Sequence, residues 1–223
     1  MPLKIYLSQV SDGNMKPDNM DKQLSVLDNR AKFLLKNNIS PNDTSLVKVS
    51  YDGDNYTRYL ILGDEKKGDG IVRESDIIVD ALVTTAANHA LFLPLADCVG
   101  AVIYDETTSV LMLSHLGRHS LEQSGGVKSV EYLLDNFNIN PDNLTVWLSP
   151  AAGRENYPLS SFEGKSLQQV AKEQLASAGI RTSSVSASSI DTTKNDSYFS
   201  HSQFLSGKRK ESGRFAVVAI IEE

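Results

Sequence analysis

The most apolar stretch of the chain is residues 90–117, which read ALFLPLADCVGAVIYDETTSVLMLSHLG. Three runs in it are β-branched or leucine-rich and have the length of β-strands: Ala90–Leu95, Gly100–Tyr104 and Val110–Ser114. Asp105–Ser109, between the last two runs, has the length of a hairpin turn. The last two runs are therefore predicted to pair as antiparallel strands.

Cys98 and His115 are the first candidates for a functional site. Cys98 lies nine residues before the turn centre at Thr107, and His115 lies eight residues after it. A hairpin with this turn makes the thiol and the imidazole neighbours. Such a pair supports either a metal site, with a thiolate and an imidazole as ligands, or a nucleophile with its base. A single cysteine beside apolar strands is also often a small buried hydrophobic residue.

On both sides of this stretch, helix and strand patterns alternate irregularly. Apolar residues at helical spacing predict helices over residues 22–37, 123–136 and 167–177. Strand patterns cover residues 4–7, 45–49, 58–62, 81–84, 145–148 and 214–221. The strands at 45–49 and 58–62 flank a tight turn at 52–55, and the last strand is apolar on both faces, which predicts a central place in a sheet. No repeat or domain boundary is visible, so we predict a single α+β domain over residues 1–223.

The composition is that of an ordinary globular protein and argues against several classes. The 223 residues include 22 Lys and Arg against 28 Asp and Glu, and the net charge of −6 argues against a general nucleic-acid binder. One cysteine rules out an internal disulfide. The apolar run Phe215–Ile221 is too short to cross a bilayer, and the first 20 residues lack the apolar core of a signal peptide. We therefore expect a cytoplasmic protein that binds neither membrane nor nucleic acid.

A second group of polar residues directly follows the first histidine candidate. Residues 115–120, HLGRHS, hold two of the four histidines of the chain together with Arg118. They lie at a predicted strand-to-helix junction, a common position for anion binding and catalysis. We predict that Arg118 and His119 bind substrate or phosphate there. His89, in a turn before a strand, is expected to be a solvent-exposed loop residue.

Short motifs run in colinear order over nearly the whole chain. They are Asn29-Arg30, Asp80-Ala81-Leu82-Val83-Thr84, Ala96-Asp97-Cys98-Val99, Tyr104-Asp105, His115-x-Gly117, Ser149-Pro150-Ala151-Ala152-Gly153, Tyr157, Tyr198-Phe199-Ser200 and Ser212-Gly213-Arg214-Phe215-Ala216. The set resembles the laccase-domain family, also called multicopper polyphenol oxidase-like, whose members are regarded as purine nucleoside phosphorylases. The resemblance implies an α+β fold of packed mixed β-sheets flanked by helices. It also implies phosphorolysis of adenosine or inosine, with deamination of adenosine in some members.

The resemblance further implies a zinc ion held by one cysteine and two histidines. Cys98 and His115 match two of these ligands, and three protein ligands leave an open position on the metal. The family's other histidine belongs to a glutamine-valine-histidine-glycine turn near residues 48–54, where this chain reads KVSYDGD. The candidates for a replacement ligand are His119, His201, Asp52 and Asp54.

Three functions remain open at this point. The first is a zinc-dependent purine nucleoside phosphorylase that takes a purine nucleoside and phosphate. The second is a non-catalytic or altered-site member that keeps the fold, because Arg118 and His119 stand where the family has tryptophan and arginine. The third is a metal-free hydrolase or deamidase with Cys98 as nucleophile and His115 as base. Further arginines beside matched motifs that could bind phosphate are Arg154 and Arg214.

Overall fold

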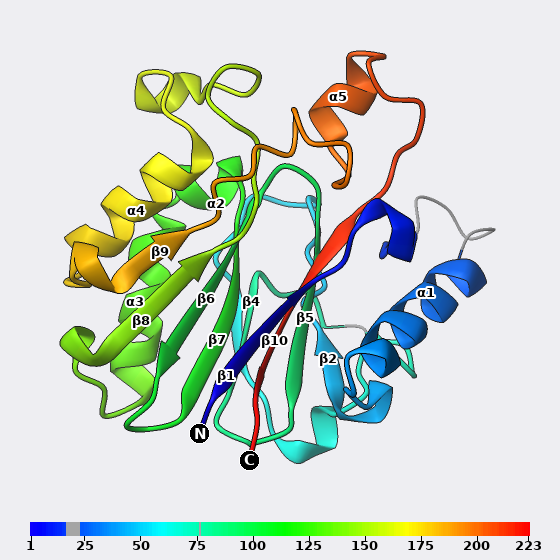
Figure 1. Ribbon diagram of the computed structural model, residues 1–223. Helices are drawn as coiled ribbons and strands as arrows, with labels where there is room; N and C mark the ends of the chain where they lie inside the picture. Colours follow the sequence, from blue (N-terminus) through cyan, green and yellow to red (C-terminus); the bar gives the residue numbers. More distant parts are fainter. Residues whose placement is uncertain (17–22, 76) are drawn as a thin grey trace.

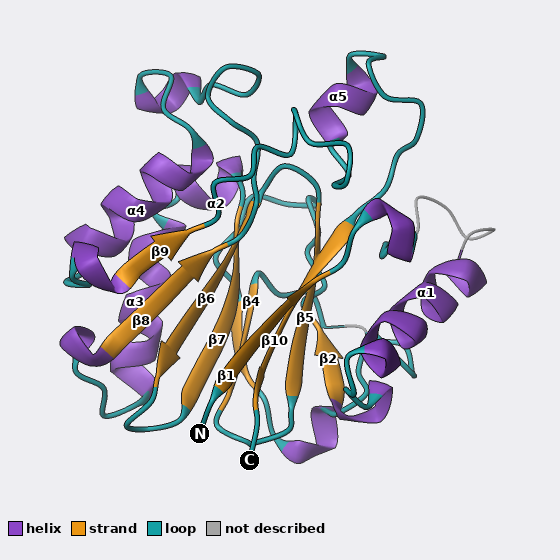
Figure 2. Cartoon of the chain, viewed as in Figure 1, coloured by secondary structure: helices purple, strands orange, loops and turns teal. Residues whose placement is uncertain are grey.

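The computed structural model describes residues 1–16, 23–75 and 77–223, and the described residues form five α-helices and ten strands. The helices are α1 (Gln23–Lys36), α2 (Arg118–Glu122), α3 (Gly125–Asn136), α4 (Leu167–Ser177) and α5 (His201–Leu205). The strands are β1 (Leu3–Leu7), β2 (Thr44–Leu46), β3 (Tyr59–Ile61), β4 (Ala81–Thr84), β5 (Ala90–Leu95), β6 (Val99–Asp105), β7 (Val110–Leu116), β8 (Leu144–Leu148), β9 (Val185–Ala187) and β10 (Phe215–Ile221). The predicted α+β class is confirmed (Figure 2).

Two mixed sheets lie face to face, with helices on their outer faces (Figure 1). One sheet has the strand order β1-β10-β5-β2, and the other has the order β3-β4-β7-β6-β8-β9. Three apolar clusters fill the space between the layers. One lies between the six-stranded sheet and α2 to α4, one between the two sheets, and one between the four-stranded sheet and α1. The packed mixed sheets that the family resemblance implied are therefore present.

Strand β10 is apolar on both faces because it is covered on both. Alternate side chains pack between the two sheets: Phe215, Val217, Ala219 and Ile221. The side chains between them pack toward α1: Ala216, Val218 and Ile220. Strand β10 pairs with β1 on one side and β5 on the other, so its predicted central position is confirmed.

Strands β6 and β7 form the predicted antiparallel hairpin, and their register brings the candidate residues to one face. Gly100 lies opposite His115 in this register. Val102 and Leu113 pack between the two sheets. Because side chains alternate along a strand, Cys98 and His115 point into the same gap between the sheets, at the end of the hairpin.

One prediction of local structure is wrong in its extent. The strands predicted at 45–49 and 58–62 are shorter and lie in different sheets, because β2 pairs parallel with β5 and β3 pairs parallel with β4. The helix predicted over 123–136 is present as α3, which begins two residues later because Ser124 has a φ of 61° and separates α3 from α2. The first residue of the helix predicted at 22–37, Lys22, lies outside the described residues, and the rest of it forms α1 apart from its last residue.

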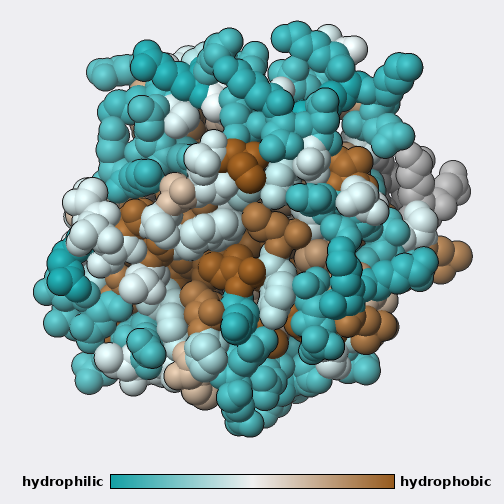
Figure 3. All heavy atoms as spheres, in the orientation of Figure 1, coloured by the Kyte–Doolittle hydropathy of each residue, from teal (hydrophilic) through white to brown (hydrophobic). Residues whose placement is uncertain are grey.

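The molecular surface shown in Figure 3 is hydrophilic at its edge and apolar near its centre, over the strands. On the inner face of the six-stranded sheet, Leu3, Val102 and Trp147 line a hollow between β1 and β8. None of the helices in the described ranges has the length and apolar character that crossing a membrane requires.

Candidate functional site

Cys98 and His115 meet at the end of the β6–β7 hairpin, which confirms their predicted proximity. A Cβ at position 117 would lie 3.1 Å from Cys98 Sγ and 3.1 Å from His115 Nε2. It would also lie 2.8 Å from His115 Cε1, which is closer than ordinary packing allows. Gly117 therefore leaves the space in which the thiol and the imidazole face one another.

Asp97, the residue before Cys98, has a left-handed backbone conformation with a φ of 75°. Its buried carboxylate accepts hydrogen bonds from Thr192 Oγ1 at 2.8 Å and from the Ser202 backbone N–H at 2.7 Å. Its backbone carbonyl accepts a hydrogen bond from the Ala152 N–H at 2.8 Å. Three later segments of the chain are thereby tied to the strand end that carries Cys98.

Asp80 positions the other side of the site. Its backbone carbonyl accepts a hydrogen bond from the His115 N–H at 2.8 Å. Its fully buried carboxylate forms an ion pair with Arg58, with Nε donating at 2.7 Å and Nη2 at 3.0 Å. This bidentate pair fixes the strand end beside which His115 lies.

His115 is a neutral imidazole at pH 7. Its side chain is buried, and burial lowers its pKa to about 4. The negative charge of Asp80 opposes this shift, and the positive charges of Lys16 and Arg58 add to it. A neutral imidazole can accept a hydrogen bond or bind a metal through one ring nitrogen.

Cys98 is a neutral thiol at pH 7. Burial and then the negative charge of Asp97 raise its pKa to about 11, against the opposing effects of Arg214 and Arg118. The resting pair with His115 is therefore uncharged. A cysteine nucleophile normally depends on a thiolate, which this environment does not stabilise.

Tyr51 is a site residue that the sequence analysis did not consider. It lies in KVSYDGD, the segment in which the family resemblance expects a histidine ligand. Its hydroxyl is close enough to the Cys98 thiol to affect the pKa of that thiol, and its ring centroid lies 6.3 Å from that of His115. The charge of a Cys98 thiolate, followed by burial, raises the pKa of Tyr51. The available signal was positional, because Tyr51 is the aromatic residue within the expected turn.

Arg118 and His119 lie at the rim of this site. The rings of His119 and Tyr56 stack with centroids 4.8 Å apart, and the ring of Tyr51 lies 6.3 Å from that of His119. Arg118 is exposed and its Nη2 donates to His119 Nε2 at 3.3 Å. The structure therefore brings both predicted binding residues close to the cysteine and histidine pair.

The zinc site implied by the resemblance is incomplete in these residues. In the ranges that the structure describes, no three His, Cys, Asp or Glu side chains come together to hold a metal ion. Cys98 and His115 are two potential ligands, and the neighbouring side chain from the segment where a third was expected is Tyr51. None of the predicted replacements completes the set: His119, His201, Asp52 or Asp54.

His89 is fully buried, so its predicted exposure is wrong. Its Nε2 lies 2.8 Å from Ser45 Oγ, because the parallel pairing of β2 with β5 brings Ser45 beside the start of β5. Of the other predicted arginines, Arg214 is close enough to lower the pKa of Cys98, whereas Arg154 is exposed.

The order of motifs and the geometry of this hairpin end agree with a comparison of the sequence with protein families. A family model described as multi-copper polyphenol oxidoreductase laccase matches residues 6–166 and 163–222. The chain belongs to this family. The laccase name does not describe its site, because a multicopper oxidase needs many histidines and the chain has four.

Among curated members related to this laccase-family chain, a purine nucleoside phosphorylase of Corynebacterium glutamicum is 28% identical over 148 residues. The match covers 66% of this chain and 56% of the relative, so the chain spans little more than half of the relative's length.

Solved structures share the fold of this laccase-family chain. YlmD from Geobacillus stearothermophilus superposes with a TM-score of 0.87 at 19% identity, over 99% of this chain and 92% of that one. The hypothetical protein YfiH of Bacillus licheniformis superposes with a TM-score of 0.84 at 19% identity, over 99% of this chain and 93% of that one. At this identity, the likeness concerns the fold alone.

Proposed function

We propose that this laccase-family chain is a purine nucleoside phosphorylase that acts on adenosine or inosine at the Cys98–His115 site. The observation that carries the proposal is the meeting of Cys98 and His115 around Gly117, in a chain that is similar to a purine nucleoside phosphorylase over 148 residues. The surrounding rings and cations provide for both parts of such a reaction.

In phosphorolysis, a phosphate oxygen forms a bond to C1′ of the ribose while the bond from C1′ to the purine nitrogen breaks. The base leaves with the electron pair and takes up a proton, and the sugar leaves as ribose 1-phosphate. Arg118 and Arg214, whose charges act on Cys98, bind the phosphate oxygens. The stacked rings of Tyr56 and His119 present a π face to the purine.

We assign no proton transfer and no metal-dependent step to Cys98 and His115. Cys98 and His115 are both neutral at pH 7. Their proposed role is to donate or accept hydrogen bonds at the reacting centre, or to coordinate a metal ion there. Zinc in the family's arrangement would polarise a bound oxygen, but the described residues supply two ligands instead of three.

The activity is tested by incubating the protein with adenosine or inosine, with and without phosphate, and separating the products. We expect free base and ribose 1-phosphate only when phosphate is present. Cys98→Ala and His115→Ala are expected to lower kcat/KM at least 100-fold, which corresponds to about 2.7 kcal/mol. Base release that is independent of phosphate would contradict phosphorolysis.

The arginine assignment has a matched control. Arg118→Ala is expected to raise the KM for phosphate about tenfold, because a guanidinium contact to phosphate is lost. Arg154→Ala removes an exposed arginine beside another family motif and is expected to leave this KM unchanged. Equal effects of the two substitutions would contradict the role of Arg118.

Zinc dependence is tested by metal content on protein purified without a metal-affinity tag. About one zinc per chain, lost in both Cys98→Ala and His115→Ala, would support the zinc-dependent form of the proposal. Absence of zinc from a protein that carries out phosphorolysis would contradict it.

A non-catalytic role is the second candidate, because residues 48–54, where the family resemblance expects a ligand histidine, contain none. The metal-free hydrolase is disfavoured by the raised pKa of Cys98. We expect alkylation of Cys98 by iodoacetamide to be slow at pH 7 and to rise about tenfold per pH unit up to the pKa. Rapid alkylation at pH 7 would favour the hydrolase.

A further inference from the structure

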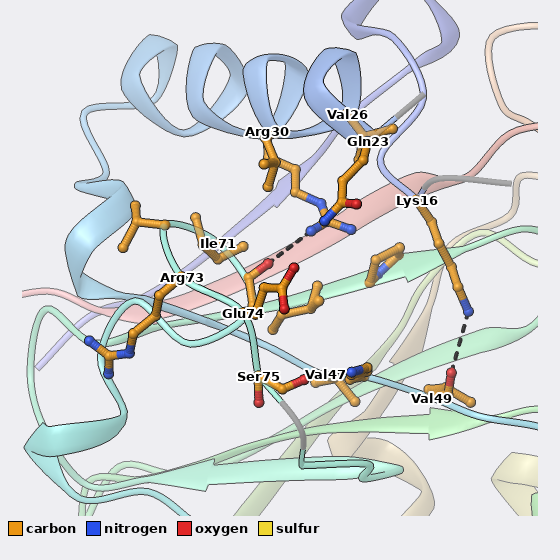
Figure 4. Close-up of a pocket in the computed structure, with 16 residues that line it drawn as sticks. Lys16, Gln23, Val26, Arg30, Val47, Val49, Ile71, Arg73, Glu74 and Ser75 are labelled. Carbon is orange, nitrogen blue, oxygen red and sulfur yellow. Dashed lines mark hydrogen bonds between the residues drawn. The ribbon is translucent and has the colours of Figure 1, made fainter. Parts of the chain in front are cut away.

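A cavity of about 490 Å³ lies between α1, β2 and the loop of residues 70–75 (Figure 4). Apart from Lys16, whose charge acts on His115, none of its lining residues is one of the residues assigned above to the Cys98–His115 site. Much of its wall is aliphatic: Val26, Leu27, Leu46, Val47, Ile71 and Pro94. The volume is in the range of cavities that hold small organic molecules.

Arg30 of α1 is a buried cation in this wall, with 5% of its surface exposed. Its Nε donates to the Met15 carbonyl and its Nη1 to the Gly70 carbonyl, each at 2.8 Å. Among the described residues, no carboxylate forms an ion pair with it and its Nη2 has no hydrogen-bond partner. Burial lowers its pKa to about 10, so it stays charged at pH 7. Figure 4 shows the side chain reaching from the helix into the cavity.

The other charged groups of the cavity lining also favour an anion. Lys16 donates to the Val49 carbonyl, Lys48 donates to the Ser75 carbonyl, and Arg73 pairs with an aspartate outside the lining. Glu74 is the one carboxylate in the described lining. The described lining therefore holds four cations, one of them paired with an aspartate outside it, and one carboxylate, in a chain whose net charge is −6.

We propose that this cavity binds an aliphatic carboxylate, with its carboxylate group on Arg30 and its chain along the apolar wall. A guanidinium with free N–H groups binds a carboxylate in a bidentate manner. The bound carboxylate would compensate the charge of Arg30, which lies over the Phe92 ring and has no ion pair among the described residues. The lining residues that the structure describes include no aromatic side chain on which a purine would stack, which separates this cavity from the nucleoside site.

The test is calorimetric titration of the full chain with decanoate below its micelle concentration, and separately with inorganic phosphate and adenosine. We expect saturable binding of decanoate. Leu27→Trp fills the cavity from α1 and is expected to weaken decanoate binding at least tenfold. Leu24→Trp, on the same helix but 82% exposed and outside the lining, is the matched control and is expected to bind as the wild type does.

Arg30→Lys keeps the positive charge but loses the paired N–H donors of the planar guanidinium, so it is also expected to weaken decanoate binding at least tenfold. Because Arg30 also holds two backbone carbonyls, the Leu27→Trp comparison decides the question if Arg30→Lys fails to fold. No saturable decanoate binding, or equal binding by Leu27→Trp and Leu24→Trp, would overturn the proposal. Loss of adenosine binding or phosphorolysis in Leu27→Trp alone would also overturn it, because the cavity would then belong to the nucleoside site.

Discussion

Tyr51 places a phenol beside Cys98 and His115, within the segment 48–54 in which the family resemblance expects a histidine. With Cys98 and His115 it forms three neighbouring side chains that are all uncharged at neutral pH. A phenol binds zinc well only after it loses its proton, and the raised pKa of Tyr51 opposes that loss. Neutral Tyr51 is therefore a poor replacement for the expected histidine ligand.

We expect Tyr51→His to raise the affinity for zinc at least tenfold, or about 1.4 kcal/mol, because a neutral imidazole is a zinc ligand at pH 7. The affinity is measured by competition with a chelating dye. Tyr51→Phe is the control, since it removes the hydroxyl without adding a ligand. An unchanged affinity in Tyr51→His would contradict the assignment of this position to the missing ligand.

His115 makes the stability of the protein depend on pH. Its pKa is about 4 in the folded protein, against an ordinary value of 6.5, so the unfolded chain binds the additional proton between these values. We expect the free energy of unfolding to fall as the pH decreases from 6.5 to 4, by up to about 3 kcal/mol from this group.

Denaturant unfolding across this pH range, in the wild type and in His115→Gln, isolates the effect of His115. His89, whose pKa is also lowered by burial, is present in both proteins and drops out of the comparison. The variant is expected to lose less stability on acidification. The same pH slope in both proteins would contradict a neutral buried His115.

At the scale of elements, the junction between β5 and β6 determines where the cysteine points. Asp97 has a positive φ and accepts two hydrogen bonds from the C-terminal third of the chain. Asp97→Ala is expected to lower the free energy of unfolding by about 2–4 kcal/mol, because it leaves two donors unsatisfied and places alanine in a strained conformation.

Asp97→Asn is the matched control, because asparagine tolerates a positive φ and keeps one acceptor oxygen. Its effect on stability, measured by chemical denaturation, is expected to be smaller. A loosened junction also exposes the thiol, so alkylation of Cys98 is expected to be faster in Asp97→Ala. Equal losses of stability in the two variants would mean that neither the tolerance of a positive φ nor the hydrogen bond that asparagine keeps contributes to stability.

At the scale of the whole molecule, the contact between the two sheets depends on Gly100 of β6. A Cβ there would lie 2.9 Å from Leu95 Cδ1 and 3.3 Å from Val217 Cγ2, both in the opposite sheet. Gly100→Val is therefore expected to destabilise the protein by about 1–3 kcal/mol through overpacking. Because Gly100 pairs with His115, the proposed phosphorolysis is expected to fall as well.

Thermal and denaturant unfolding measure this effect, with Thr145→Val as the control. Thr145 is an exposed residue of β8 in the same sheet as Gly100, so its substitution is expected to change stability by less than about 0.5 kcal/mol. A Gly100→Val variant as stable as the control would contradict the tight contact between the sheets (Figure 1).

Local pattern was sufficient to predict the hairpin and the pair that it carries. The alternation of two apolar runs around Asp105–Ser109 determines both the register and the faces, so the amino-acid sequence by itself places Cys98 and His115 together. The continuous apolar run at the C-terminus likewise predicted a strand covered on both faces. These features depend on neighbours that are close in sequence.

The remaining features depend on contacts between distant segments. Strands β2 and β3 are three residues each and pair with β5 and β4, so no local turn determines their partners. That pairing buries His89 and brings Tyr51 to Cys98. Only the tertiary structure decided these positions, because short parallel pairs gain their stability from the sheets that they join and not from their own sequence.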